Sequence, residues 1–274
     1  MPRPRLVTLT TDVGPVYAAQ MRAVLYSSLP PGSVVDLADD LAPHRVGEAG
    51  FFLHHAAERF PAGTVHLAVV DPGVGGRRAP VAIETADGSR LVGPDNGLLV
   101  PLAEALGVRR VMRLDPKRVA PGARVSTTFE GRDVFAPAAA KLALGAPLGS
   151  LGTAWTLRVR PPRPEPSRTA RGIRGEIVYV DRFGNAITNV PSDWLPTEGA
   201  LVEVEIGAAR PRRLHRRRTY EELRVGQAGV LGSSFGTLEI SVRESSSAAR
   251  FGIEVGTSIR FRSPAAASEH RSRK

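Results

Sequence analysis

The feature that most constrains the fold of this chain is a short, mainly apolar run that ends in a carboxylate. Residues 64–70 are rich in apolar and β-branched side chains, which is typical of a buried parallel strand. Asp71 follows, and residues 72–76 contain one proline and three glycines, so the strand must end here in a tight turn. Ligands of open α/β sheets bind at the carboxyl edge of the strands. Asp71 is therefore predicted either to belong to a ligand site or to cap the backbone of its own turn.

Strands and helices alternate over the first 150 residues or so. Strands are predicted at 5–12, 34–37 and 111–114, a hairpin at 81–93, and helices at 17–29, 47–59, 134–144 and in a segment ending at Leu106. This alternation predicts an α/β N-terminal domain, residues 1–157, with a Rossmann-like layered sheet.

The pattern changes after residues 158–174, a stretch rich in Pro and Arg that we interpret as a linker. Short strands separated by turns are predicted at 175–181, 201–206, 229–231, 237–242 and 257–261. They predict a smaller all-β C-terminal domain, residues 175–263, folded as a barrel. The polar residues 264–274 are predicted to form a disordered tail.

Composition narrows the class of protein. The chain has 274 residues and a net charge of +10. It has no cysteine, which excludes disulfides and thiolate metal ligands. No stretch approaches the roughly 20 apolar residues of a membrane span, and no signal peptide is apparent, so a cytoplasmic enzyme is expected. The excess of arginine fits a GC-rich coding bias. A basic surface nevertheless leaves a nucleic-acid-binding protein as an alternative.

Five polar motifs lie in order along the chain. They are Thr10-Thr11-Asp12; Val70-Asp71-Pro72-Gly73-Val74-Gly75 with Arg78; Gly93-Pro94-Asp95-Asn96-Gly97-Leu98; Phe129-Glu130-Gly131-Arg132-Asp133; and Asp181-Arg182-Phe183-Gly184-Asn185 with Thr188-Asn189. In this order they resemble the S-adenosyl-L-methionine (SAM) hydroxide adenosyltransferases, a family that also contains the fluorinases and chlorinases. The resemblance implies hydrolysis of SAM to adenosine and L-methionine without a cofactor. It also implies an α/β domain followed by a β-barrel, and a homotrimer with active sites between subunits.

The chemistry of the predicted catalytic residues follows from the leaving group. A sulfonium departs as a neutral thioether, so the site mainly has to hold and activate a water. A fixed guanidinium favours the hydroxide form of a nearby water, so Arg78 can activate the water. Asp71 can orient both Arg78 and the water. Asp71 and Arg78 match the water-using branch of the family, whereas the halogenases resemble Tyr-Pro-Ala-Thr-Gly at residues 71–75, which argues against halide as the nucleophile.

Two departures from the family pattern leave alternatives open. The family has a His where this chain has Glu130, so Glu130 is predicted either to act as the general base or to mark an altered, halogenase-like or inactive ligand-binding relative. A carboxylate next to Asp71 also requires Arg78 and Arg132 to offset the repulsion between like charges. The loop after Asp12 is about two residues shorter than in the family and lacks a second Asp.

Substrate contacts are predicted from both domains. Asp12 can accept hydrogen bonds from ribose hydroxyls, Phe183 can stack on adenine, and the Asn185 amide can bind the ribose or the amino-acid end. The resemblance adds Asn96, Ser233, Ser234, Glu239, Val242 and Arg243, with Ser234 and Glu239 at the amino-acid end and the Val242 backbone at the adenine edge. From local pattern alone, the serines are turn residues and Phe183 is a core aromatic.

Two further clusters are not expected to carry the function. His54 and His55 are adjacent on a predicted helix, where their side chains are expected to point different ways with no carboxylate suitably spaced, so no metal is expected. The basic run 210–218 contains six arginines and could bind phosphates. Because it lacks interleaved aromatics and lies between predicted strands, a solvated hairpin is favoured and no nucleic-acid partner is expected.

Overall fold

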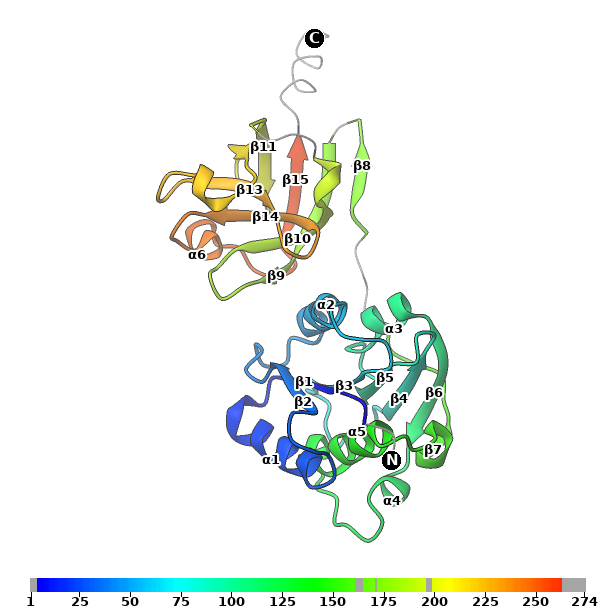
Figure 1. The fold of residues 1–274 in the computed structure, drawn as a ribbon. Helices are drawn as coiled ribbons and strands as arrows, with labels where there is room; N and C mark the ends of the chain where they lie inside the picture. The colour runs from blue at the N-terminus through cyan, green and yellow to red at the C-terminus, as the bar shows by residue number, and fades with distance from the viewer. Residues whose placement is uncertain (1–3, 161–164, 171, 196–198, 263–274) are drawn as a thin grey trace. The chain divides into compact units, whose positions relative to one another are not determined.

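The structure, a computed structural model, describes residues 4–160, 165–170, 172–195 and 199–262 (Figure 1). The chain forms two compact units, Met1–Pro161 and Pro162–Lys274. The tail expected at 264–274 lies outside the described residues. Within the segment expected to be a linker, residues 161–164 and 171 also lie outside them, and the described part contains β8 (Ser167–Thr169) and the first residues of β9 (Gly172–Val180).

The first unit is built on a mixed seven-stranded sheet. Its strands, in the order β2-β1-β3-β5-β4-β6-β7, are β2 (Val34–Ala38), β1 (Val7–Thr11), β3 (Val65–Val69), β5 (Arg90–Pro94), β4 (Pro80–Thr85), β6 (Val108–Leu114) and β7 (Gly152–Ala154). β2, β1, β3 and β5 are mutually parallel, whereas β4 is antiparallel to both of its neighbours and β7 is antiparallel to β6. The α/β prediction is confirmed as a mixed sheet, and a Rossmann-like order can apply only to its parallel part.

Helices cover both faces of this sheet, as Figure 1 shows. They are α1 (Gly14–Tyr26), α2 (Val46–Ala57), α3 (Val100–Leu106), α4 (Pro116–Val119), the π-helix η1 (Gly131–Phe135), α5 (Ala136–Ala143) and the 3₁₀ helix η2 (Leu148–Leu151). One core cluster joins Leu67 of β3 to α1 and α5, and another joins Ala68 of the same strand to α2 and α3. Because successive side chains of a strand face opposite sides, this double burial explains why β3 reads as a continuous apolar run.

The second unit is a closed barrel of seven strands. Around the barrel they are β10 (Ala186–Pro191), β14 (Thr237–Val242), β13 (Ala228–Gly232), β12 (Arg212–Arg216), β11 (Leu201–Ile206), β15 (Ser258–Arg262) and β9, and β9 pairs with β10 to close it. The strand β8 pairs with β9 outside the ring. The helical pieces are η3 (Ser192–Trp194), η4 (Tyr220–Glu222) and α6 (Ser247–Phe251). The predicted barrel is confirmed.

The basic run between residues 210 and 218 matches its prediction only in part. The expected solvated hairpin is present in part, because β12 pairs antiparallel with the preceding β11; β12 also pairs with β13, which makes it an internal strand of the barrel. Leu214 is buried in the barrel core, while Arg212 and Arg213 are exposed. Pairing on both edges explains the difference, because such pairing is invisible in the local pattern of charges.

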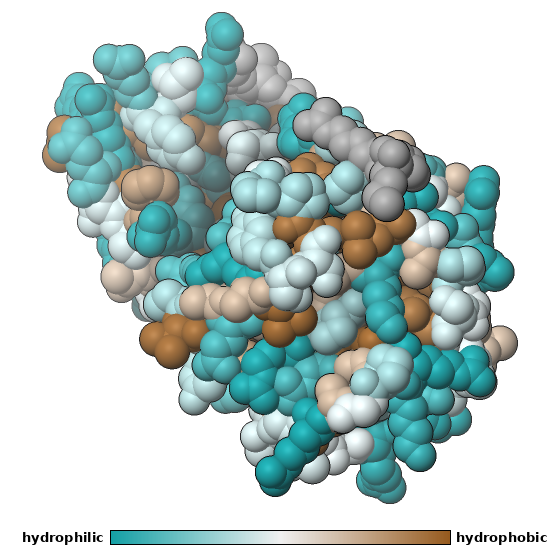
Figure 2. Space-filling view, turned by 60° about the horizontal axis from the view of Figure 1, so that its bottom comes forward, coloured by the Kyte–Doolittle hydropathy of each residue, from teal (hydrophilic) through white to brown (hydrophobic). Residues whose placement is uncertain are grey.

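One face of the molecule shows how polar and apolar side chains are distributed. In the view of Figure 2, polar side chains cover most of the visible face and apolar ones form scattered patches. Within the described residues, no helix has the length and apolarity needed to cross a lipid bilayer.

Candidate functional site

The end of β3 places Asp71 next to a second loop. The turn after Asp71 is closed by hydrogen bonds from Val74 N–H to Asp71 O (3.2 Å) and from Gly76 N–H to Gly73 O (3.0 Å). Gly75 has a φ of +72°, and a Cβ at this position would lie 2.3 Å from the carbonyl oxygen of Thr127. Only glycine therefore lets the turn approach the loop that carries Glu130.

Arg78 lies between two carboxylates. Its Nε donates to Asp71 Oδ1 (3.1 Å) and Oδ2 (2.8 Å), and its Nη2 also bonds Asp71 Oδ2. On its other side, Nη1 lies 2.6 Å from Glu130 Oε2. The three side chains are largely buried, with 9% of Arg78, 5% of Asp71 and 17% of Glu130 exposed. Like-charge repulsion between the carboxylates is offset by this one guanidinium.

The electrostatics keep Arg78 charged. Burial alone would lower its pKa, but the hydrogen bonds and charges of Asp71 and Glu130 outweigh burial and raise the pKa of Arg78 above its ordinary value. The guanidinium also lies over the Phe135 ring, 5.6 Å from its centroid. The site therefore holds a permanent positive charge between two oxygen acceptors.

Arg132 does not take part in this balance, although it was expected to. Its Nε donates to Asp133 Oδ1 (2.6 Å) and its Nη1 to Gln20 Oε1 (3.0 Å). Asp133 in turn accepts from Ser126 N–H (2.8 Å), so the pair holds the start of the loop that carries Glu130. The ion pair with Arg132 lowers the pKa of Asp133. These contacts give Arg132 and Asp133 the role of fixing the loop.

A cavity of about 380 Å³ opens beside these groups in the first unit. Its lining includes three of the predicted residues, Asp12, Asp71 and Glu130, and residues that were not predicted, among them Tyr17, His44 and Phe129. The rings of Tyr17 and Phe129 meet edge to face, with centroids 5.3 Å apart. The cavity thus combines carboxylates with aromatic walls.

His44 is held in an uncommon backbone conformation at this cavity. Its φ is +67°, in the left-handed region, and its N–H donates to Asp12 Oδ2 (2.8 Å). Such conformations are typical of functional sites because the surrounding structure has to offset their strain. Nothing in the local sequence Pro43-His44 indicates this placement, since it depends on a contact with Asp12, 32 residues away.

Asn96 does not line the cavity. Its Nδ2 donates to Val70 O (2.8 Å) and its Oδ1 accepts from Leu98 N–H (3.1 Å), so its amide joins the end of β3 to the following turn. The neighbouring Asp95 is buried and accepts from Trp155 Nε1 (2.9 Å) and Arg158 N–H. The motif that contains both residues therefore holds neighbouring backbone segments together by hydrogen bonds.

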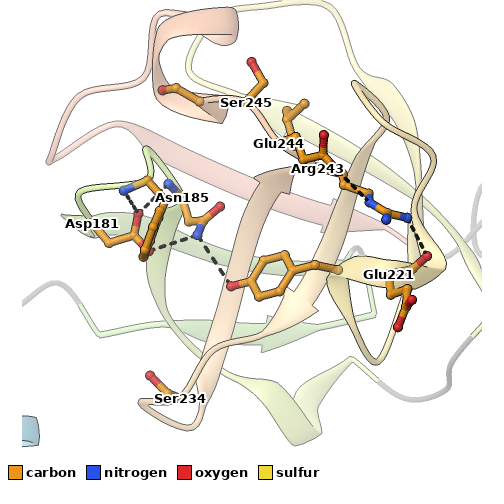
Figure 3. A pocket seen from close by; sticks show the side chains of 11 residues that line it. Asp181, Asn185, Glu221, Ser234, Arg243, Glu244 and Ser245 are labelled. Atoms are coloured by element: carbon orange, nitrogen blue, oxygen red, sulfur yellow. Dashed lines mark hydrogen bonds and ion pairs between the residues drawn. The ribbon is translucent and has the colours of Figure 1, made fainter.

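The second unit has a larger cavity of about 820 Å³ (Figure 3). Five predicted substrate residues line it: Phe183, Asn185, Ser234, Val242 and Arg243. In Figure 3, Asp181 and Asn185 lie on one side and Arg243 and Glu221 on the other.

The turn between β9 and β10 presents its polar and aromatic groups to this cavity. Asp181 Oδ1 accepts from the N–H groups of Phe183 (2.9 Å) and Asn185 (2.8 Å), and Asp181 Oδ2 accepts from Asn185 Nδ2 (2.9 Å). Gly184 has a φ of +80°, and a Cβ there would lie 2.0 Å from Ser246 Oγ. Phe183 is 73% exposed, so it is not the core aromatic that the local pattern favours.

Ser233 and Glu239 lie behind the lining. Ser233 Oγ lies 3.0 Å from Thr237 Oγ1 and accepts from Phe235 N–H (3.2 Å), which makes Ser233 a turn residue. Glu239 is buried and accepts from Tyr220 Oη (2.5 Å) and Ser241 Oγ (2.8 Å). Tyr220 itself lines the cavity and was not predicted.

Burial changes the pKa values of Glu239 and Tyr220. It raises the pKa of Glu239, an effect that the hydrogen bonds from Tyr220 and Ser241 oppose. It also raises the pKa of Tyr220, which the bond to Glu239 raises further. The Tyr220 hydroxyl therefore stays protonated and serves as a donor to Glu239.

The comparisons with known proteins assign the family. A model of the SAM hydroxide adenosyltransferase N-terminal domain matches residues 7–152, and a model of the C-terminal domain matches residues 175–260. The chain belongs to this family. The proteins named (R)-S-adenosyl-L-methionine hydrolase from Thermus thermophilus and Salinispora tropica are 40% and 38% identical to this family member. The aligned regions cover 89% and 93% of this chain, and 94% and 96% of theirs.

The fluorinases are more distant relatives of this adenosyltransferase family member. A fluorinase from Actinoplanes sp. is 28% identical over 68% of this chain and 71% of its own. The crystal structure of a conserved protein from Thermotoga maritima superposes with a TM-score of 0.88 at 29% identity, covering 94% of this chain and all of that one. The sequence-based assignment to the family is confirmed.

Proposed function

We propose that this protein is an adenosine-forming SAM hydrolase. The observation that carries the proposal is the placement of Arg78 between Asp71 and Glu130 at a cavity, in a chain whose 34–40% identical relatives are named (R)-S-adenosyl-L-methionine hydrolase. A buried guanidinium with flanking carboxylates suits the activation of a water.

The proposed reaction is a direct displacement at the ribose C5′. The water oxygen forms a bond to C5′ while the C5′–S bond breaks. The electron pair of the C5′–S bond goes to sulfur, so that methionine leaves as a neutral thioether. The water gives up one proton, which Glu130 accepts and then releases to solvent. Arg78 stabilises the developing hydroxide, and Asp71 orients both Arg78 and the water.

The substrate is proposed to contact groups from both units. Asp12 accepts from ribose hydroxyls beside His44. Phe183 stacks on adenine, Asn185 binds the ribose or amino-acid end, and the Val242 backbone meets the adenine edge. Ser234 and Arg243 contact the amino-acid end, while Glu239 acts through Tyr220. No cofactor is needed, because the sulfonium already activates the leaving group.

Two further properties stay predictions that the family resemblance supports. One is a homotrimer in which neighbouring chains complete each site, and the other is a cytoplasmic location.

The second candidate function is that of a halogenase-like or catalytically altered SAM-binding relative. The observation that favours it is Glu130, which replaces the family His next to Arg78. The presence of Asp71 in place of the halogenase Tyr speaks against halide as the nucleophile.

The test is to incubate purified protein with each sulfonium epimer of SAM in heavy-oxygen water. We expect adenosine labelled at the 5′-oxygen, together with L-methionine, identified by mass spectrometry. Arg78→Gln should abolish turnover, whereas Arg77→Gln, which changes the exposed neighbouring arginine, should not. Formation of chlorinated or fluorinated nucleoside faster than adenosine in halide buffer would favour the second candidate, and absence of any product would indicate a SAM-binding relative.

A further inference from the structure

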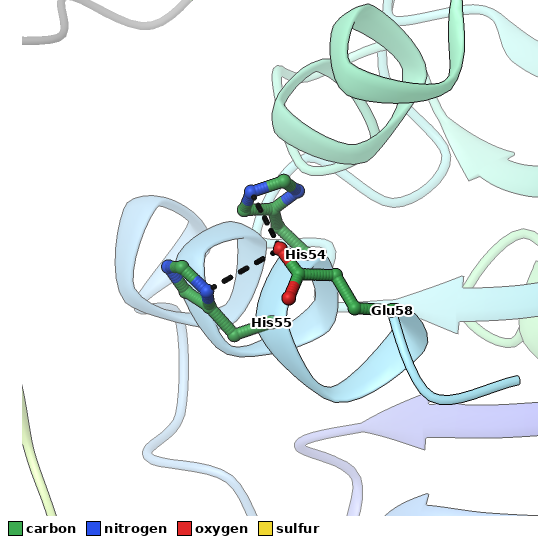
Figure 4. A group of neighbouring side chains, drawn as sticks. All are labelled: His54, His55 and Glu58. Atoms are coloured by element: carbon green, nitrogen blue, oxygen red, sulfur yellow. Dashed lines mark ion pairs between the residues drawn. The ribbon is translucent and has the colours of Figure 1, made fainter. Parts of the chain in front are cut away.

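A group of metal-binding side chains lies at the end of α2, among residues that the proposed reaction does not use (Figure 4). His54 and His55 occupy the last turn of α2, and Glu58 follows at its C-terminal cap. One carboxylate oxygen, Glu58 Oε1, lies 3.5 Å from His54 Nε2 and 3.7 Å from His55 Nδ1. Figure 4 shows the two rings on either side of the Glu58 carboxylate.

Helical spacing explains how two adjacent histidines can contact the same carboxylate. Glu58 is four residues after His54 and three after His55, and both spacings bring side chains together on a helix surface. Although neighbouring residues diverge by about 100° around the helix axis, Glu58 projects between them. The expectation that no carboxylate is suitably spaced is therefore wrong, because Glu58 contacts both histidines.

The distances suit a small divalent ion. One ligand atom from each of the three residues lies within 4.8 Å of the others. A zinc ion bound at about 2.0–2.2 Å in a tetrahedral site holds its ligands about 3.3 Å apart. The two distances from Glu58 Oε1 to the histidine nitrogens, 3.5 and 3.7 Å, are within a few tenths of an ångström of that spacing. Because the ligand atoms are known only to lie within 4.8 Å of one another, binding also requires the histidine side chains to rotate toward each other.

The surroundings of the three side chains favour the binding of a cation. The C-terminal end of a helix carries a partial negative charge, which attracts cations. Glu58 is 53% exposed, which leaves room for water as a further ligand.

We propose that His54, His55 and Glu58 form a binding site for one divalent transition-metal ion of the zinc class. Imidazole ligands select zinc, copper or nickel over magnesium and calcium, which prefer oxygen ligands. Two histidines and one glutamate with an open position form a known zinc ligand set. The alternative is an ion pair between a protonated histidine and Glu58, which needs no metal.

Metal titration of the whole protein tests the site. Protein stripped with a chelator is titrated with Co²⁺ and followed by visible absorption, and with Zn²⁺ by calorimetry. We expect one ion per chain, the intense band of four-coordinate cobalt, and displacement of cobalt by zinc. Zinc should also raise the melting temperature, because the ion binds the folded form.

Matched variants locate the ion. Glu58→Gln keeps the side-chain shape at an exposed position, so folding should be retained, and affinity should fall at least about tenfold. His54→Gln should do the same, whereas His215→Gln, which removes a histidine of the barrel unit, should leave affinity unchanged. Equal zinc affinity in wild type and Glu58→Gln, or no uptake by wild type, would overturn the assignment.

Discussion

At the scale of single residues, Glu130 decides how the proposed reaction handles its proton. Glu130→Gln keeps the shape and removes the carboxylate that lies 2.6 Å from Arg78 Nη1. General-base catalysis contributes about 10²–10⁴-fold, so kcat should fall by a factor in that range, with little change in KM. Steady-state kinetics on SAM measures both. Glu130→His should retain more activity than Glu130→Gln, because it restores the usual family residue. A Glu130→Gln enzyme as fast as wild type would leave Asp71 and Arg78 to activate the water alone.

A second residue-scale prediction concerns pH and Glu239. Burial raises the pKa of Glu239 above its ordinary value of 4.5, so the folded protein holds this proton more tightly than the unfolded chain does. Its contribution to stability is therefore present below pH 4.5 and is lost as the pH rises through the raised value. Glu239→Gln should flatten this part of the profile. Urea unfolding at a series of pH values measures it, with Glu221→Gln as an exposed control. Profiles of the same slope for Glu239→Gln and wild type would contradict the prediction.

At the scale of elements, the loop at 126–130 depends on the start of the following helix. Asp133 holds Ser126 N–H and is itself paired with Arg132. Asp133→Asn keeps an acceptor but loses the ion pair, so the loop and Glu130 should shift. Because misplacement of about 1 Å can cost about 10²-fold, we expect kcat to fall by one to two orders of magnitude. The double variant with Glu130→Gln separates the causes: if Asp133 acts through Glu130, its substitution should add little in that background. Fully additive losses would indicate a general structural effect.

The elements also show what the sequence could predict. The β3 strand and the Asp71 turn are encoded locally, by a continuous apolar run followed by Pro and Gly, and both lie where they were expected. β12 was missed because its only buried apolar side chain, Leu214, is surrounded by basic residues, and pairing with β11 and β13 makes it a strand. His44 and Tyr220 reach their cavities through loops whose paths depend on distant contacts. Glu58, by contrast, was available from helical spacing alone.

At the scale of the whole molecule, the candidate groups are divided between two units. Asp71 and Glu130 line the cavity of the first unit, and Arg78 pairs with both without lining it. The exposed Phe183 and the Asn185 amide line the cavity of the second unit. Neither cavity alone offers both a water-activating group and the turn carrying Phe183 and Asn185. The order of motifs along the chain predicted this division, but a sequence does not specify which copies of the chain cooperate.

The last prediction tests that cooperation directly. If each site combines the first unit of one chain with the second unit of its neighbour, light scattering should give a particle of three times the 29.2 kDa chain mass. Arg78→Gln and Phe183→Ala should then complement each other when co-expressed, because some sites receive neither change. Random mixing in equal amounts leaves about one quarter of such sites intact. Activity is measured at SAM concentrations far below the KM of Phe183→Ala, where that variant alone is nearly inactive. Restored activity well above the mean of the two separate variants supports sites shared between chains. A mixture that only averages the two variants would place each site within a single chain, and a monomer mass at micromolar concentration would exclude the trimer.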